Sequence, residues 1–270
     1  MRLAGRHALV TGGGTGIGAA IARALAEEGV RLTLVGRRRG KLEEVARSCS
    51  PAQAGAQTST GPRPSPGSIH VATADVTNRD QVEAAFAEAR ATHGPISILI
   101  NNAGAASSAP FAKQTPEDWH ATMAVNLDAL LHTCQAALPD LLAAEDGRIV
   151  TIASTAGLKG YGITAAYVAA KHGAVGLTRA LAVEFAKTRM TVNAVCPGFT
   201  ETELVEESIA TIVDKTGRSA GEARALLTQF NPQGRLVSPQ EVAHAVLWLC
   251  LPQSRSINGQ AIAVAGGEVM

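Results

Sequence analysis

Hydrophobic positions along the chain follow two different patterns. Short runs rich in Val, Ile and Leu alternate with longer segments whose apolar residues recur at helical spacing. The short runs predict buried strands, and the longer segments predict amphipathic helices. The strand-like runs lie at about 7–11, 31–35, 69–74, 96–101, 148–153, 190–195 and 260–264. This alternation predicts an α/β fold, a doubly wound, seven-stranded parallel sheet of Rossmann type with helices on both faces.

No interior break divides the chain, so we expect residues 1–270 to form a single catalytic domain. One segment departs from the alternation of strands and helices. Residues 49–68, between the second helix and the third strand, are rich in Pro, Gly, Ser, Thr and Ala. That composition predicts a flexible surface insertion.

A glycine-rich turn follows the first predicted strand and opens a helical pattern, in the run Val10-Thr11-Gly12-Gly13-Gly14-Thr15-Gly16-Ile17-Gly18. Glycines at positions 12, 16 and 18 permit a tight turn, a close approach of backbone to phosphate, and close packing of helix on strand. The free N–H groups at the helix start favour a pyrophosphate. Because strand, turn and helix come in this order, we predict a dinucleotide site rather than a merely flexible loop.

Tyr167 and Lys171 lie four residues apart in an alanine-rich segment, residues 163–187, that predicts a helix. This spacing places both side chains on one face. A free phenol has a pKa of about 10, and a nearby ammonium lowers it by about 1–3 units. We therefore expect Tyr167 to act as a general acid/base, with Ser154 holding a substrate oxygen beside it. Such pairs also occur by chance on solvated helix faces, so the interpretation depends on the other motifs.

Those motifs, in this order, resemble the short-chain dehydrogenase/reductase family in its single-domain form, and the resemblance covers nearly the whole chain. They are Thr11-Gly12-x-x-x-Gly16-x-Gly18, Asn101-Asn102-Ala103-Gly104, Asn126, the set Ser154, Tyr167 and Lys171, Pro197-Gly198 with Thr202, and Gly259-Gln260 with Gly266-Gly267.

The resemblance implies four catalytic residues, namely Asn126, Ser154, Tyr167 and Lys171. Asn126 would hold a water that links Lys171 to solvent, although an asparagine there could also satisfy only local backbone groups. Lys171 would also bind the nicotinamide ribose. The implied cofactor-binding residues are Gly12, Gly14, Thr15, Gly16, Ile17, Gly18, Arg37, Arg38, Asp75, Val76, Asn102, Ala103, Gly104, Tyr167, Lys171, Pro197, Gly198, Phe199 and Thr202.

The choice of cofactor can be argued from the end of the second strand. Arg37 lies nineteen residues beyond Gly18, where an acidic residue would hydrogen-bond the ribose hydroxyls of NAD. The chain has Arg37-Arg38-Arg39 instead. Guanidinium groups pair well with phosphate, so we expect NADP(H) rather than NAD(H). The alternative is a solvated basic turn.

The expected reaction is hydride transfer between NADP(H) and a carbonyl or alcohol carbon of a small molecule. Residues 192–199 and 154–157 resemble ketoreductases and 3-hydroxyacyl dehydrogenases, which favours a 3-oxoacyl thioester. A hydrophobic alcohol, steroid or cyclic ketone remains an alternative. So does a redox sensor that binds NADP(H) without turnover, although such a protein would be expected to lose a catalytic residue.

By the same resemblance, residues 199–231 form a substrate lid. Apolar residues recur there at helical spacing, and they fit a lid or ordinary core packing equally well. They are Val205, Ile209, Ile212 and Val213.

The family also usually forms dimers or tetramers, so we expect a homotetramer or homodimer. The predicted helix around Tyr167 offers small residues for close approach, although these could instead pack on the sheet. They are Ala165, Ala166, Ala169, Ala170 and Ala174.

Composition narrows the range of partners. The net charge is +1, from 24 basic and 23 acidic residues, so no general field attracts nucleic acid or an anionic membrane. No stretch approaches the 18 apolar residues of a membrane span, and we expect a cytoplasmic protein. The four cysteines and seven histidines are scattered, which predicts reduced thiols and no metal site.

Overall fold

The computed structural model describes residues 1–49 and 67–270. The predicted insertion, 49–68, therefore lies almost entirely outside the described residues.

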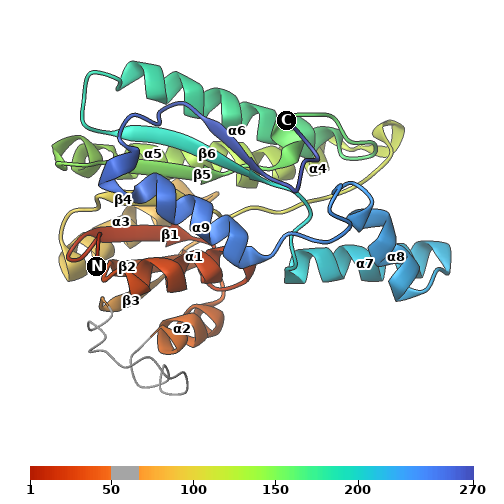
Figure 1. The fold of residues 1–270 in the computed structure, drawn as a ribbon, viewed down its shortest axis with the longest axis horizontal. Coiled ribbons are helices and arrows are strands. Elements are labelled where there is room, and N and C mark those ends of the chain that lie inside the picture. Colours follow the sequence, from red (N-terminus) through yellow and green to blue (C-terminus); the bar gives the residue numbers. More distant parts are fainter. Residues whose placement is uncertain (50–66) are drawn as a thin grey trace.

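The strands form one parallel sheet in the order β3-β2-β1-β4-β5-β6-β7. Their bounds are β1 His7–Thr11, β2 Arg31–Gly36, β3 Ile69–Thr73, β4 Ile98–Asn101, β5 Arg148–Ile152, β6 Thr191–Pro197 and β7 Ala261–Val264. The predicted doubly wound sheet is confirmed. Figure 1 shows β1 and β4 to β6 in the middle of the molecule, with helices on both sides.

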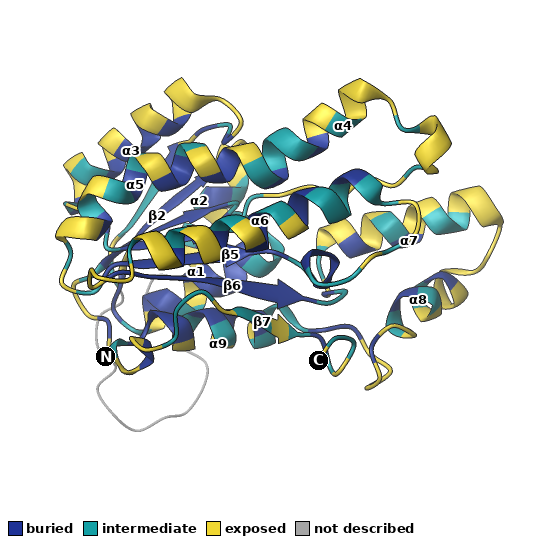
Figure 2. Cartoon of the chain, turned by 90° about the horizontal axis from the view of Figure 1, so that it is seen from above, coloured by how far each residue is buried: buried dark blue, intermediate teal, exposed yellow. Residues whose placement is uncertain are grey.

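The helices cover both faces because successive strand residues point to opposite sides. In β1, Ala8 and Val10 enter the core beneath α1, α2 and α9, whereas Leu9 enters the core beneath α3 and α5. The central strands are accordingly buried on both faces (Figure 2). The helices are α1 Gly16–Glu27, α2 Arg39–Ser48, α3 Arg79–His93, α4 Pro116–Met123, α5 Ala129–Ala143, α6 Ala165–Glu184, α7 Glu203–Thr216, α8 Ala220–Thr228 and α9 Pro239–Cys250.

The segment predicted as a lid or as core folds as α7 and α8, which lie to one side of the sheet in Figure 1. Its apolar stripe packs within the segment itself. Val205 and Ile209 of α7 are buried against Ala223 and Leu227 of α8 and against Leu236. This cluster is separate from the two cores that flank the sheet.

The edge formed by the carboxyl ends of the strands positions the candidate site. From β1 the chain builds outward to β2 and β3, whereas β4 to β7 extend in the other direction. In such sheets ligands bind beyond the carboxyl ends, at the point where strand order reverses. β1 and β4 flank that point, and they end at Thr11 and Asn101.

Candidate active site

The glycine turn between β1 and α1 requires glycine for steric reasons. Gly12 has φ +64°, in the left-handed region. A Cβ at Gly18 would lie 2.2 Å from the carbonyl oxygen of Gly12, and one at Gly12 would lie 2.8 Å from Asn102 Nδ2. Backbone and side chain therefore already fill the space that any larger residue would need, and the turn keeps the helix start open toward a ligand.

The loop after β4 holds this turn in shape. Thr11 Oγ1 accepts hydrogen bonds from the backbone N–H groups of Asn102 at 3.0 Å and Ala103 at 3.1 Å. Asn102 Nδ2 donates to the carbonyl oxygens of Thr11 and Gly12, both at 3.0 Å. The predicted Asn102-Ala103-Gly104 motif thus lies directly against the glycine turn.

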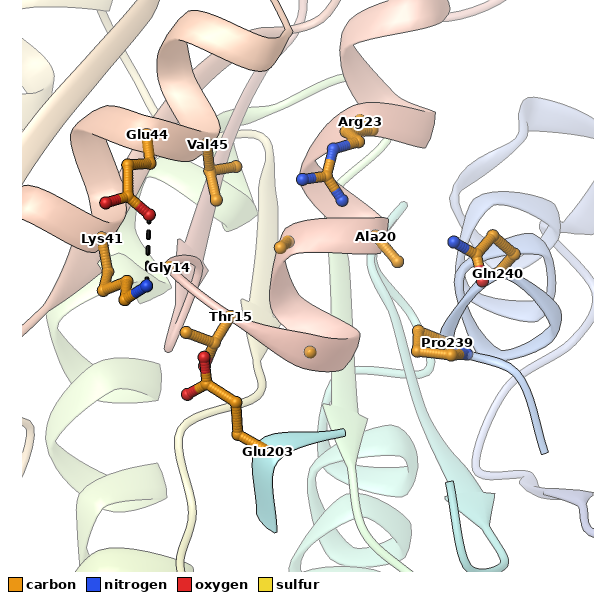
Figure 3. A pocket seen from close by; sticks show the side chains of 12 residues that line it. Gly14, Thr15, Ala20, Arg23, Lys41, Glu44, Val45, Glu203, Pro239 and Gln240 are labelled. Carbon is orange, nitrogen blue, oxygen red and sulfur yellow. Dashed lines mark hydrogen bonds and ion pairs between the residues drawn. The ribbon is translucent and has the colours of Figure 1, made fainter. Parts of the chain in front are cut away.

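Basic side chains border the outer side of the turn. A cavity of about 320 Å³ opens there between α1, α2, α7 and α9, with Arg23 and Lys41 in its wall (Figure 3). Lys41 pairs with Glu44 at 3.2 Å. None of the four predicted catalytic residues lines this cavity. Sequence reasoning missed both Arg23 and Lys41, because they reach the turn only through the packing of α1 and α2.

The arginines that follow β2 lie at the same end of the site. Arg38 Nη2 is 3.5 Å from Thr15 Oγ1 and 3.3 Å from Glu203 Oε2, in an exposed ion pair. Burial alone would raise the pKa of Asp75, but that pKa lies below its usual value because Thr77 donates two hydrogen bonds and Arg37 lies near. A glycine turn with Arg38 at its edge and Arg37 next to it in sequence fits a dinucleotide that carries an additional phosphate.

The predicted catalytic serine and tyrosine come together at the carboxyl end of β5. Ser154 caps the short 3-10 helix Thr155–Gly157, and its Oγ accepts from the N–H of Ala156 at 3.1 Å. Tyr167 lies in the first turn of α6. Its phenol also interacts with the Ser154 hydroxyl. The arrangement allows both hydroxyls to contact one substrate oxygen.

The predicted effect of Lys171 on the phenol is wrong for this structure. Burial raises the pKa of Tyr167, and the interaction with Ser154 opposes the rise only in part. Lys171 Nζ lies 5.6 Å from the tyrosine ring centroid but donates to the carbonyl oxygen of Ile152 at 3.0 Å. Burial also lowers the pKa of Lys171 to about 8. Desolvation thus favours the neutral form of both groups, an effect that helical spacing alone does not reveal.

Asn126 lies in a π-helical turn, Ala124–Asp128, between α4 and α5. Its Nδ2 donates to the carbonyl oxygens of Ala105 at 2.8 Å and Thr122 at 2.9 Å. A Cβ at Gly104 would lie 2.9 Å from Asn126 Oδ1 and 3.6 Å from Lys171 Nζ. Asn126 therefore satisfies local backbone groups and also borders Gly104 together with Lys171.

The loop after β6 returns to the glycine turn. A Cβ at Gly16 would lie 2.9 Å from the methyl group of Thr202, the residue that precedes α7. Pro197, Gly198 and Phe199 lead into this contact from the end of β6. The loop thus joins the predicted cofactor site to the start of the segment 199–231.

Three polar residues beside Ser154 were not predicted from the sequence. The Tyr161 hydroxyl donates to the Glu268 carboxylate and hydrogen-bonds Thr155 Oγ1 at 2.6 Å. Lys159 Nζ lies 3.1 Å from Glu268 Oε1. Tyr161 and Glu268 are 107 positions apart in the chain, so sequence spacing could not predict their contact. The only sequence signal near Glu268 is the turn indicated by Gly266-Gly267.

Within the described ranges 1–49 and 67–270, no group of three or more His, Cys, Asp or Glu side chains is placed to hold a metal ion. All four cysteines lie in these ranges and are free thiols. In the same part of the chain, no helix has the length and apolar character needed to cross a membrane.

Comparison with known proteins shows the family of the chain. The model of the short chain dehydrogenase family matches residues 6–212. D-beta-hydroxybutyrate dehydrogenase of Cupriavidus necator is 36% identical over 268 residues, which are 99% of each chain. The 3-oxoacyl-[acyl-carrier-protein] reductase FabG of Thermotoga maritima is 30% identical over 270 residues, the full length of both. A solved structure of a variant actinorhodin polyketide ketoreductase with NADPH superimposes with TM-score 0.88 at 35% identity, and the match covers 97% of each chain.

The fold and these relatives define an oxidoreductase that uses a nicotinamide dinucleotide. The chain belongs to the short-chain dehydrogenase family, as its motifs predicted. The NADPH in the matched structure agrees with the predicted cofactor.

Proposed function

We propose that the protein is an NADP(H)-dependent ketoreductase in which Tyr167 is the general acid/base. One observation carries the proposal. Ser154, Tyr167 and Lys171 converge at the carboxyl end of the sheet, beside the loop that shapes the glycine turn. That convergence also disfavours a redox sensor without turnover, which would not need a serine hydroxyl that interacts with a phenol.

When bound, the cofactor supplies or accepts the hydride. In reduction, Tyr167 donates its proton to the carbonyl oxygen, and Ser154 holds that oxygen by a hydrogen bond. Because burial raises the pKa of Tyr167, the phenol is protonated near neutral pH and is ready to act as an acid. Lys171 and Asn126 border Gly104, where a water can link the lysine to solvent and return the proton to Tyr167.

The preference for NADP(H) rests on Arg37 and Arg38. Both follow β2, and Arg38 reaches Thr15 of the glycine turn. An additional phosphate on the cofactor ribose would replace the exposed Glu203 as the partner of Arg38. NAD(H) lacks that phosphate and leaves both guanidinium groups unused.

We propose a 3-oxoacyl thioester as the substrate. The similarity to FabG and to polyketide ketoreductase supports this choice. A cyclic or steroid ketone is the second candidate, because the Phe199 and Phe230 rings stack at 5.6 Å at the two ends of segment 199–231 and offer an apolar surface. In both cases we propose that α7 and α8 act as a lid.

The chain offers a surface for assembly, and we propose a cytoplasmic homotetramer of single-domain subunits. Of the alanines proposed for close approach, Ala166, Ala170 and Ala174 are already buried within the chain. Apolar side chains that remain exposed on α5 and α6 include Leu131 and Val183, and they suit an interface better. Light scattering tests this assembly, and a monomeric mass would exclude it.

The substrate is tested by NADPH oxidation with a panel of acyl-thioester, cyclic and aliphatic ketones. We expect the highest kcat/KM with a 3-oxoacyl thioester. Preference for cyclic ketones would favour the second candidate. Tight NADPH binding with no turnover on any member would favour the sensor and contradict the proposed function.

A further inference from the structure

Glu268 brings a buried carboxylate to the active site from the end of the chain. It follows β7, and its side chain is 0% exposed. A carboxylate withdrawn from water needs partners. Its Oε1 has two, the Lys159 ammonium at 3.1 Å and the Tyr161 hydroxyl. Its Oε2 makes no hydrogen bond within the described residues and lies against Gly198, where a Cβ would be only 2.9 Å away.

The hydrogen bonds from Glu268 lead to the catalytic serine. A carboxylate accepts only, so the Tyr161 hydroxyl donates to Glu268. The Tyr161 oxygen then accepts from Thr155 Oγ1 at 2.6 Å. Thr155 is buried and is bonded in sequence to Ser154. A chain of polarised hydrogen bonds therefore joins the carboxyl-terminal segment to the turn that carries the serine.

The same cluster holds both ends of segment 199–231. The Tyr161 ring packs edge-on against Phe199 at 6.3 Å and Phe230 at 5.7 Å. Lys159 Nζ lies over the Tyr161 ring at 4.9 Å and over the Phe230 ring at 5.6 Å. A shift of Glu268 would therefore disturb the serine turn and both ends of the lid together.

Stability alone does not account for this arrangement. A buried ion pair often contributes no more to stability than well-packed apolar residues of similar volume. Here the pair also leaves one carboxylate oxygen without a hydrogen-bond partner among the residues that the structure describes. The pair instead fixes the position of the Tyr161 hydroxyl, because charge-assisted hydrogen bonds restrain a hydroxyl more strictly than apolar contacts do.

We propose that Glu268 is a positioning residue for the reaction. It fixes Tyr161, and through Tyr161 it holds the Ser154 turn and both ends of the lid in the arrangement that proton transfer from Tyr167 requires. The inference rests on the proposed function. It adds that the carboxyl-terminal segment sets the geometry of the active site. The Tyr161 hydroxyl already donates its proton to Glu268, so it is not available to a substrate oxygen and does not replace Tyr167 as the acid.

The kinetic test compares Glu268→Ala, Glu268→Gln and Tyr161→Phe. We expect Glu268→Ala to lower kcat about tenfold while the Kd for NADPH stays within about twofold, because the serine turn and not the glycine turn is disturbed. Glu268→Gln should lose less, since its carbonyl can still accept from Tyr161. The control is Glu145→Gln near the amino end of β5. It removes an exposed ion pair, in which Glu145 lies 3.5 Å from Arg189.

The double variant Tyr161→Phe with Glu268→Ala separates this role from independent damage. Because both residues act in one hydrogen-bond chain, the double variant should lose no more than the worse single variant. Losses in kcat that multiply, or a Glu268→Ala protein with the kcat of the unmodified chain, would overturn the proposal.

A spectroscopic measurement tests the contact without turnover. The chain has two tyrosines, so selective isotope labelling of the ring carbon that bears the hydroxyl gives two NMR signals, and Tyr167→Phe assigns them. We expect Glu268→Ala to move the Tyr161 signal and Glu145→Gln to leave it in place. An unmoved signal would overturn the contact and the proposal.

If the signal moves but no ketone is reduced, the proposed function fails, and the positioning role fails with it. If ketones are reduced with unchanged kcat in Glu268→Ala, only the positioning role fails.

Discussion

At the scale of single residues, Ile163 shows strain next to the catalytic helix. Its φ is +57°, the one positive value of a non-glycine residue within 1–49 and 67–270. This region is unfavourable for a β-branched side chain and costs about 1–3 kcal/mol. The Ile163 carbonyl accepts from the N–H of Ala109 at 2.8 Å, and its side chain is 60% exposed. The strained residue therefore lies where two loops contact each other just before α6, and not in the core.

We predict that Ile163→Gly raises the free energy of unfolding by about 1 kcal/mol, because glycine adopts this φ without strain but costs more backbone entropy on folding. Urea unfolding measures the change. Ile163→Val keeps the branched side chain and should leave the free energy nearly unchanged. If Ile163→Gly is less stable than the unmodified protein, side-chain contacts of Ile163 contribute more to the free energy of unfolding than the backbone strain costs.

At the scale of elements, the sequence predicted the helices and turns that are held by contacts between residues close together in the chain. The turn between β1 and α1 and the helix α6 were both predictable, because each depends on neighbouring residues and regular spacing. The π-helical turn around Asn126 was not predictable, since long-range hydrogen bonds to the loop at Ala105 help to set its geometry. The direction of the Tyr167 pKa shift was mispredicted for a related reason. Burial depends on the tertiary structure and not on the four-residue spacing to Lys171.

The turn between β2 and α2 carries the prediction on the cofactor. We expect Arg37→Ala to weaken NADPH binding about tenfold and to leave NADH binding within about twofold, since a charge-assisted hydrogen bond contributes about 1.5–3 kcal/mol. Fluorescence titration with both cofactors gives the ratio. Arg39 is the first residue of α2 and pairs with Glu43 of the same helix at 2.8 Å, so Arg39→Ala supplies the control variant. Equal losses for the two cofactors would contradict selection through the phosphate.

At the scale of the whole molecule, a buried histidine links stability to pH. His7 is 1% exposed and bridges two elements, with Nδ1 2.8 Å from the Gly94 carbonyl oxygen and Nε2 2.9 Å from Thr33 Oγ1. Burial lowers the pKa of His7 to about 4. In the unfolded chain the pKa of this histidine is about 6.5, so the unfolded state binds the proton more readily than the folded state does. The contribution of neutral His7 is therefore fully present above about pH 6.5 and is lost as pH falls toward 4.

We predict that the free energy of unfolding falls by up to about 3 kcal/mol between pH 7 and pH 4 through this group. His7→Gln should flatten that part of the profile, as measured by urea unfolding at several pH values. His120 is exposed, and His120→Gln should leave the slope as it is. If the free energy of unfolding depends on pH equally in the unmodified protein, His7→Gln and His120→Gln, His7 is excluded as the cause.

The central claim is that Tyr167 transfers the proton, and Tyr167→Phe tests it most directly. The measurement is kcat for ketone reduction together with the Kd for NADPH, with Tyr161→Phe as the matched loss of a hydroxyl. We predict that Tyr167→Phe lowers kcat about a thousandfold and keeps NADPH binding within about twofold, whereas Tyr161→Phe loses only about tenfold. A Tyr167→Phe protein that reduces ketones at the rate of the unmodified chain would contradict the account.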